Sequence, residues 1–90
     1  MRIHRYPLAV RAAQAIEIPA TATPLSVAPG RQGYYIDMWA HVPDNAALVS
    51  CMVYVVGTGH TTPIEVNDAH FVGTCVMPDQ LVWHVFIEAR

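Results

Sequence analysis

The sequence predicts an all-β protein, a small antiparallel β-sandwich or open barrel of about six to seven strands. Apolar and polar residues alternate with a period of two along most of the chain, which is typical of strands that bury one face. Clusters of proline, glycine, aspartate and asparagine separate these runs at regular intervals. Helix-forming composition is confined to residues 8–15, so we expect at most one helical turn there.

The first half of the chain contains three expected strands, at residues 2–8, 14–18 and 25–28. Pro7 makes the first an edge strand or one that ends early, because proline has no N–H to donate to a neighbouring strand. Pro19 ends the second strand, and a turn at Pro29 and Gly30 follows the third.

The second half is expected to form two hairpins. A long alternating strand at 34–42 ends in a turn of proline, aspartate and asparagine, and the run at 47–56 is its predicted hairpin partner. That run is apolar on both faces, which indicates a central strand. An irregular polar stretch at 58–68 separates it from the closing hairpin, whose strands lie at 70–77 and 81–88.

The composition indicates one domain, residues 1–90, with an apolar surface that forms an interface with another protein or another copy of the chain. Apolar residues make up 53% of the chain and charged residues 13%, about half of the usual quarter. So few charges cover a small globule poorly, and large exposed apolar patches mark interfaces. We therefore expect a homo-oligomer or a face that binds a partner.

The charge pattern excludes several partners. The net charge is −2, lysine is absent, and the arginines are scattered, so the basic surface of a duplex nucleic-acid binder is not present. No signal-peptide pattern opens the chain, and no apolar run approaches the roughly 20 residues that cross a bilayer. We expect a cytoplasmic protein without a membrane partner.

The sharpest local feature is the run VVGTGH, which ends the strand at 47–56. It suggests a phosphate-binding loop, but the lysine and the following helix of such loops are missing. A glycine-rich β-turn with positive φ is the main prediction, and a nest of backbone N–H groups is the alternative. The candidate ligand- or partner-binding residues are Gly57, Thr58, Gly59, His60, Thr61 and His70.

Catalytic and metal-binding patterns are weak. No two histidines or cysteines stand at the close spacings of zinc sites, so we predict no metal, no cofactor and no catalytic residue. His60 and His70 flank the polar loop and could meet across it, with Glu65 nearby, which leaves a small metal- or acid–base-dependent enzyme as an alternative. Cys51 and Cys75 lie in strand-like runs and are predicted to be buried thiols, and the sequence leaves open whether they are close.

The remaining histidines and the aromatic residues are expected in the core. His4, His41 and His84 alternate with apolar neighbours, which favours hydrogen-bonded core histidines. Aromatic rings fill the core of most domains this small, although a stacking face for bases is an alternative. The aromatic residues in question are Tyr34, Tyr35, Trp39, Tyr54 and Trp83.

Five segments follow one another in order between residues 3 and 86: IHRYPL, IEIPATATPLSV, MWAHVPDNA, VYVVGTGHTTPI and HFVGTCVMPDQLVWHVF. With these motifs the chain resembles an uncharacterised family of small proteins from tailed phages and prophages. The resemblance implies a phage origin, expression in the bacterial cytoplasm and an accessory gene, and it brings no established activity.

These observations together favour a protein that acts by binding. We expect a non-enzymatic phage accessory protein used in counter-defence or host takeover, which inhibits a host protein or sequesters a signal nucleotide. A structural or morphogenesis accessory of the virion is the first alternative, and the small enzyme using the GTGH loop is the second.

Overall fold

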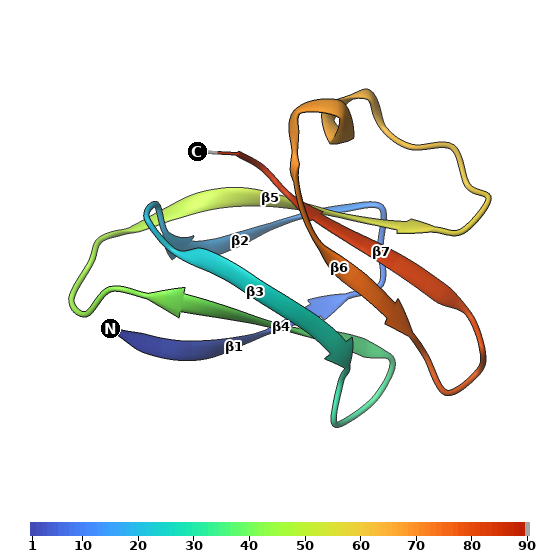
Figure 1. The fold of residues 1–90 in the computed structure, drawn as a ribbon, viewed down its shortest axis with the longest axis horizontal. Helices are drawn as coiled ribbons and strands as arrows, with labels where there is room; N and C mark the ends of the chain where they lie inside the picture. Colours follow the sequence, from blue (N-terminus) through green and yellow to red (C-terminus); the bar gives the residue numbers. More distant parts are fainter. Residues whose placement is uncertain (90) are drawn as a thin grey trace.

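The computed structural model describes residues 1–89, in which two antiparallel sheets pack face to face (Figure 1). The strands are β1 Arg2–Ala9, β2 Ala13–Pro19, β3 Thr23–Pro29, β4 Tyr35–Val42, β5 Leu48–Gly57, β6 His70–Val76 and β7 Val82–Ile87. One sheet has the order β1-β4-β3 and the other β2-β5-β7-β6. A short 3-10 helix, η1, spans Ile64–Asp68, and no helix in the described residues is long and apolar enough to cross a membrane. The predicted all-β class is confirmed, as a sandwich and not a closed barrel.

The predicted hairpin between the fourth and fifth strands is wrong. β4 pairs with β1 and β3, whereas β5 pairs with β2 and β7 in the other sheet. The chain instead crosses between sheets after β4, so that Met38 and Val53 enter one core from opposite layers. β1 is an edge strand and β5 a central one, as predicted.

The chain between β1 and β2 contains a bend and no helical turn. β1 runs to Ala9 and β2 starts at Ala13, so residues 10–12 are all that connects the two sheets here. The Gln14 side chain replaces a strand partner at this corner, because its amide donates to the Ala9 carbonyl over 2.7 Å and its oxygen accepts from the Ala9 N–H over 3.1 Å. These side-chain bonds satisfy backbone groups that a helix would otherwise pair.

The buried core cluster is aliphatic, with Trp83 packed against it, so the expected aromatic filling is wrong for the other named aromatic residues. None of the described core residues is aromatic; they are Leu8, Ile18, Ile36, Met38, Ala40, Val42, Cys51, Val53, Val55, Cys75, Met77, Val85 and Ile87. The inner faces of two packed sheets lie about 10 Å apart, a gap that medium-sized interdigitating side chains fill. Tyr35 is exposed, Trp39 is half-buried on an outer face, and Tyr54 is buried on the outer side of β5, so the aromatic residues do not form one stacking face.

The predicted core histidines are also outside the core. His4 is exposed, and His41 is half-buried on β4, where alternation turns it to the outer side with Trp39. His84 is half-buried on the outer face of the four-stranded sheet, opposite Thr74. An imidazole keeps its hydrogen bonds more easily at such a position than between two aliphatic layers.

Candidate functional site

Asp37 is a buried carboxylate on the outer side of the three-stranded sheet. Its neighbours on β4, Ile36 and Met38, point into the core, so Asp37 points outward. Its exposed fraction is nevertheless only 1%. The Arg5 guanidinium on β1 donates a hydrogen bond to Oδ1 over 3.1 Å, whereas Oδ2 is buried without a hydrogen-bond partner. Buried polar atoms are rarely left in this state, so Oδ2 marks an acceptor that a ligand could use.

A cleft of about 540 Å³, which we name the Asp37 cleft, opens beside this carboxylate. Its lining residues are Arg5, Pro7, Arg31, Gln32, Tyr35 and Asp37. The volume is in the range of small-molecule sites. Two guanidinium groups, an amide, a phenol ring and a carboxylate meet there, and this set suits a ligand that is both charged and planar.

The loop between β3 and β4 carries Arg31 and Gln32, and the fold holds it at both ends. The Gly30 N–H donates to the Tyr35 carbonyl over 2.7 Å, which closes the loop. A Cβ at position 30 would lie 2.7 Å from that same oxygen, so the closure requires glycine. At the other end, the Tyr34 side chain is hydrogen-bonded to the β6–β7 hairpin. The loop therefore presents its two polar side chains from an anchored position.

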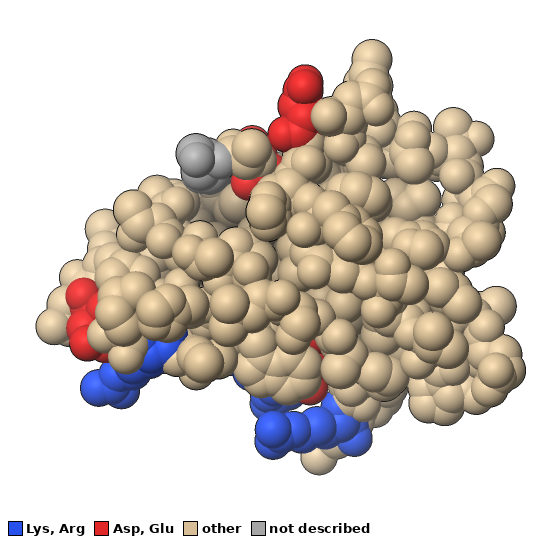
Figure 2. Space-filling view, in the orientation of Figure 1, with Lys and Arg blue, Asp and Glu red and all other residues tan. Residues whose placement is uncertain are grey.

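Three arginines lie on the side of the sandwich that carries the cleft, two of them paired with carboxylates. Arginine side chains lie at the lower border of the molecule in Figure 2, where acidic side chains adjoin them, and further acidic side chains stand at the upper border. Among the described arginines, Arg2 and Arg5 lie on β1 and Arg31 follows β3. Glu65 lies in η1 and Glu88 follows β7. Arg2 is paired with Asp44 and Arg5 with Asp37, so Arg31 is the arginine of this side with no ion pair among the described residues.

The segment Gly57 to His60 forms the predicted glycine turn. The His60 N–H donates to the Gly57 carbonyl over 3.0 Å, and Gly59 has φ 86°, the pattern of a type II turn. Gly57 is needed for space, since a Cβ there would lie 2.7 Å from the His60 ring, which packs edge-on against Trp83 at 6.0 Å between centroids. The Thr58 N–H donates to a β7 carbonyl. Two of the amides that an anion-binding nest would use are therefore already occupied.

Thr58 also takes part in a hydrogen-bond network of side chains centred on His84. The His84 Nε2 lies 2.8 Å from the Thr58 hydroxyl and its Nδ1 lies 3.0 Å from the Thr74 hydroxyl. A neutral imidazole donates at one nitrogen and accepts at the other, so both contacts are satisfied at once. The predicted hydrogen bonding of His84 is present, although on the outer face of the sheet. Thr61, the last candidate of the loop, is exposed.

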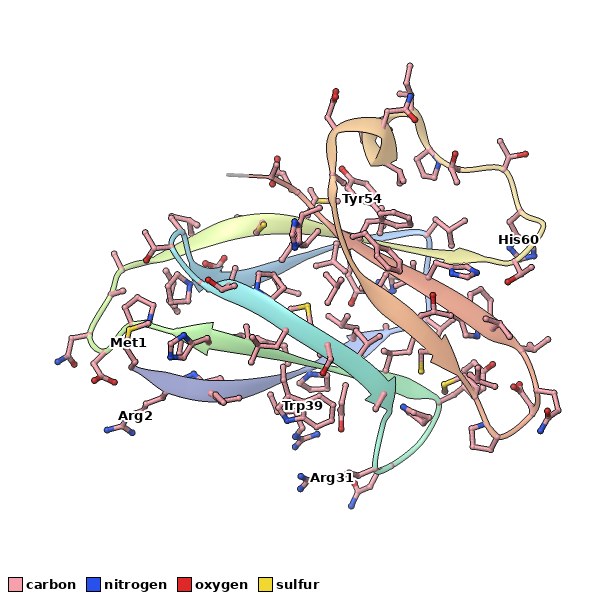
Figure 3. The ribbon with its side chains drawn as sticks, in the orientation of Figure 1. Met1, Arg2, Arg31, Trp39, Tyr54 and His60 are labelled. Atoms are coloured by element: carbon pink, nitrogen blue, oxygen red, sulfur yellow. The ribbon has the colours of Figure 1, made fainter. Side chains whose placement is uncertain are left out.

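His60 and His70 lie toward opposite ends of β7. His60 contacts Trp83 near the start of this strand, whereas His70 begins β6 and pairs with the residue that ends β7. Four residues of strand correspond to about 13 Å. Figure 3 places His60 at one end of the sandwich, far from Arg31 and Trp39 on its lower side. This register does not bring His60, His70 and Glu65 together, and the described residues contain no group of three His, Cys, Asp or Glu that could hold a metal.

His70 lines a second, smaller cleft of about 270 Å³, at one end of the space between the sheets. The lining is mainly apolar and comprises Ile18, Pro19, Ala20, Ala22, Thr23, Pro24, Val49, Cys51, His70, Ile87, Glu88 and Ala89. Its polar side chains do not converge as those of the Asp37 cleft do, and its volume lies just below the usual range of ligand sites, about 300–1,000 Å³.

Cys51 and Cys75 are both buried free thiols, as predicted. They lie toward opposite ends of the four-stranded sheet, because Cys75 pairs with Trp83 while Cys51 pairs with Ile16 on the far strand β2. Burial raises the pKa of the Cys75 thiol, whose sulfur lies 3.6 Å from that of Met77. A buried thiol with a raised pKa is a poor nucleophile.

The Asp37 cleft was not predicted from the sequence, although a signal was present. Asp37 is the one charged residue in the run at 34–42, where every neighbour is apolar or aromatic except a histidine. Alternation alone places it on a solvent-facing side. Its burial depends on Arg5, 32 positions earlier, and on the loop before β4. A lone charge in a long strand is the pattern that would have identified the site.

These features define a small two-sheet β-sandwich with a polar cleft on the outer face of its smaller sheet. A family model described as Domain of unknown function (DUF7352) matches residues 1–90, and the chain belongs to this family. The description names no activity. No curated protein matches the chain, and no solved structure matches it. The expected membership of an uncharacterised family is confirmed, while the phage origin stays a prediction.

Proposed function

We propose that this chain is a non-enzymatic binding protein of a tailed phage or prophage, which works in the bacterial cytoplasm in counter-defence or host takeover. Of the two routes expected from the sequence, blocking a host protein and sequestering a signal nucleotide, the Asp37 cleft favours the nucleotide. The observation that carries this choice is the convergence of Arg5, Arg31 and a half-satisfied Asp37 carboxylate on one cleft.

Each part of a nucleotide has a matching group in the cleft. Guanidinium groups bind phosphate oxygens through paired, charge-assisted hydrogen bonds, and Arg31 on the loop before β4 supplies such a group. The Tyr35 ring is 47% exposed and offers a surface on which a base can stack. Asp37 and Gln32 supply acceptors for polar edges. The volume of about 540 Å³ admits a ligand of this size.

Calorimetric titration of the purified protein with a panel of nucleoside mono-, di- and cyclic phosphates tests the proposal. At least one nucleotide should bind, and more weakly as salt concentration rises, because exposed charges are screened. Arg31→Ala should weaken binding by about tenfold or more, the loss of one charge-assisted contact. Arg11→Ala is the matched control, since Arg11 is an exposed arginine outside the cleft lining.

Three outcomes contradict the proposal. If no nucleotide gives a measurable heat of binding, the protein does not bind nucleotides. If the Arg31 and Arg11 variants weaken binding equally, the Asp37 cleft is not the nucleotide site. If mass spectrometry finds the chain in purified virions in stoichiometric amounts, the structural alternative replaces it.

A further inference from the structure

We infer that the Asp37 cleft selects guanine, with the Asp37 carboxylate as the group that recognises the base; this rests on the proposed function. An ionised carboxylate has two oxygens with about four acceptor positions and no donor. Arg5 occupies one position on Oδ1, and no described group occupies Oδ2. The site is therefore complementary to a ligand edge that donates a hydrogen bond to each oxygen and presents no acceptor to them.

Guanine is the base whose edge meets this requirement. Its N1–H and its 2-amino group are adjacent donors that point the same way, so they can reach the two oxygens of one carboxylate. Adenine and cytosine place a ring-nitrogen acceptor beside their amino donor, and uracil places its single N–H between two carbonyl oxygens. In each of these three bases an acceptor would face a carboxylate oxygen and be repelled by it. Their single donor edge would also leave one of the two Asp37 oxygens without a hydrogen bond.

The arrangement of the cleft supports this orientation. Tyr35 and Asp37 are two residues apart on β4, so they share a face and lie about 7 Å apart along the strand. A base stacked on the Tyr35 ring would thus present its edge toward the carboxylate. Arg5 remains bonded to Oδ1 and fixes the plane of the carboxylate. Arg31 and Gln32 lie on the loop at the rim, where the ribose and phosphate would extend.

Access to Oδ2 requires one lining side chain to move, because this atom is buried. Tyr35 is exposed, so its side chain can change rotamer without disturbing the core or the Arg5 hydrogen bond to Oδ1. Side-chain rotamer changes of this kind are common on binding. Arg31 is the competing internal partner for Oδ2, since it lines the same cleft and can neutralise the carboxylate without any ligand.

Titration of the unmodified protein with GMP, IMP and AMP at one salt concentration tests the inference without any risk of misfolding. IMP lacks only the 2-amino group of GMP. GMP should bind about tenfold more tightly than IMP, which loses one hydrogen bond to a charged acceptor, and more tightly still than AMP. Equal affinities for the three nucleotides would overturn the selection of guanine and leave nucleotide binding itself intact. No binding by any of them, together with none in the wider nucleotide panel, would remove the proposed function as well.

The Asp37→Asn variant provides a reversal test. An asparagine offers one acceptor and one donor, which match the N1–H and the 2-carbonyl of xanthine. The variant should lose about tenfold in affinity for GMP and gain affinity for XMP, which the unmodified protein repels. Binding of XMP would also show that the variant is folded. A folded Asp37→Asn variant that keeps its preference for GMP contradicts the inference. Arg31→Ala removes the competing internal partner of Oδ2, so this variant should still prefer GMP to AMP. Equal binding of AMP and GMP by Arg31→Ala also contradicts the inference.

Discussion

The indole N–H of Trp83 donates a hydrogen bond to the Tyr34 hydroxyl over 3.2 Å, which joins β7 of one sheet to the loop that precedes β4 of the other. The same hydroxyl donates to Asp79 over 2.8 Å. One phenol thereby links the β6–β7 hairpin to the segment that carries Arg31. The loop that carries two lining residues of the Asp37 cleft is therefore held by the β6–β7 hairpin of the other sheet.

Tyr34→Phe removes both of these hydrogen bonds and keeps the ring. The free energy of unfolding should fall by about 1 kcal/mol, the low end for two bonds, because the groups are exposed to water. Urea denaturation measures this change. Tyr35→Phe is the matched control, because the Tyr35 hydroxyl has no hydrogen-bond partner in the described structure, and it should change stability by less than about 0.5 kcal/mol. Equal effects of the two substitutions would show that the Tyr34 link is not stabilising.

Gly57→Ala tests the contact between the GTGH turn and β7. The added Cβ would lie 2.7 Å from the His60 ring and 3.0 Å from Trp83, so the ring must leave its position. We expect a loss of about 1–3 kcal/mol, typical of overpacking. The double variant Gly57→Ala with His60→Ala should recover part of it, since the clashing ring is gone, and a thermal or urea double-mutant cycle measures the coupling.

Gly59→Ala is the control for this cycle. A Cβ at Gly59 meets nothing within 4 Å, but φ is 86°, so the cost is backbone strain of about 1–2 kcal/mol. His60→Ala should not relieve it. Rescue of both glycine variants by His60→Ala, or of neither, contradicts the steric account of Gly57.

How far the sequence predicts this fold depends on how local each cause is. The strands lie close to their expected positions because alternation and turn residues act over a few neighbours. The GTGH turn was likewise predictable from its glycines, and the positive φ of Gly59 confirms it. Strand pairing was not, because β4 and β5 are adjacent in the chain but their apolar faces pack across the sandwich. The burial of Asp37 is non-local in the same way, since it depends on Arg5 on a neighbouring strand.

Thr58→Val and Thr74→Val test whether His84 is held by two hydroxyls. Each substitution keeps the shape of the side chain and leaves one imidazole nitrogen without its partner. We expect each to lower the free energy of unfolding by about 0.5–1 kcal/mol, since water can partly replace the hydroxyl. Thr61→Val, at an exposed position of the same loop, should have no measurable effect in urea denaturation. A Thr61 variant as destabilised as the other two would mean that valine itself disfavours these positions.

The two cysteines give a prediction on thiol chemistry and on pH. Both side chains are buried, so a thiol reagent should label neither at a fast rate in the native protein and both in urea. Rapid labelling of one thiol without denaturant would contradict the described packing. Because burial raises the pKa of Cys75 in the folded state, its contribution to stability is complete below the unfolded thiol pKa of about 8.5 and is lost as pH rises through the folded pKa. Urea midpoints should therefore fall in this alkaline range. In Cys75→Ala that part of the fall should disappear, although this variant is less stable at neutral pH, and an unchanged alkaline slope would assign the effect to other groups.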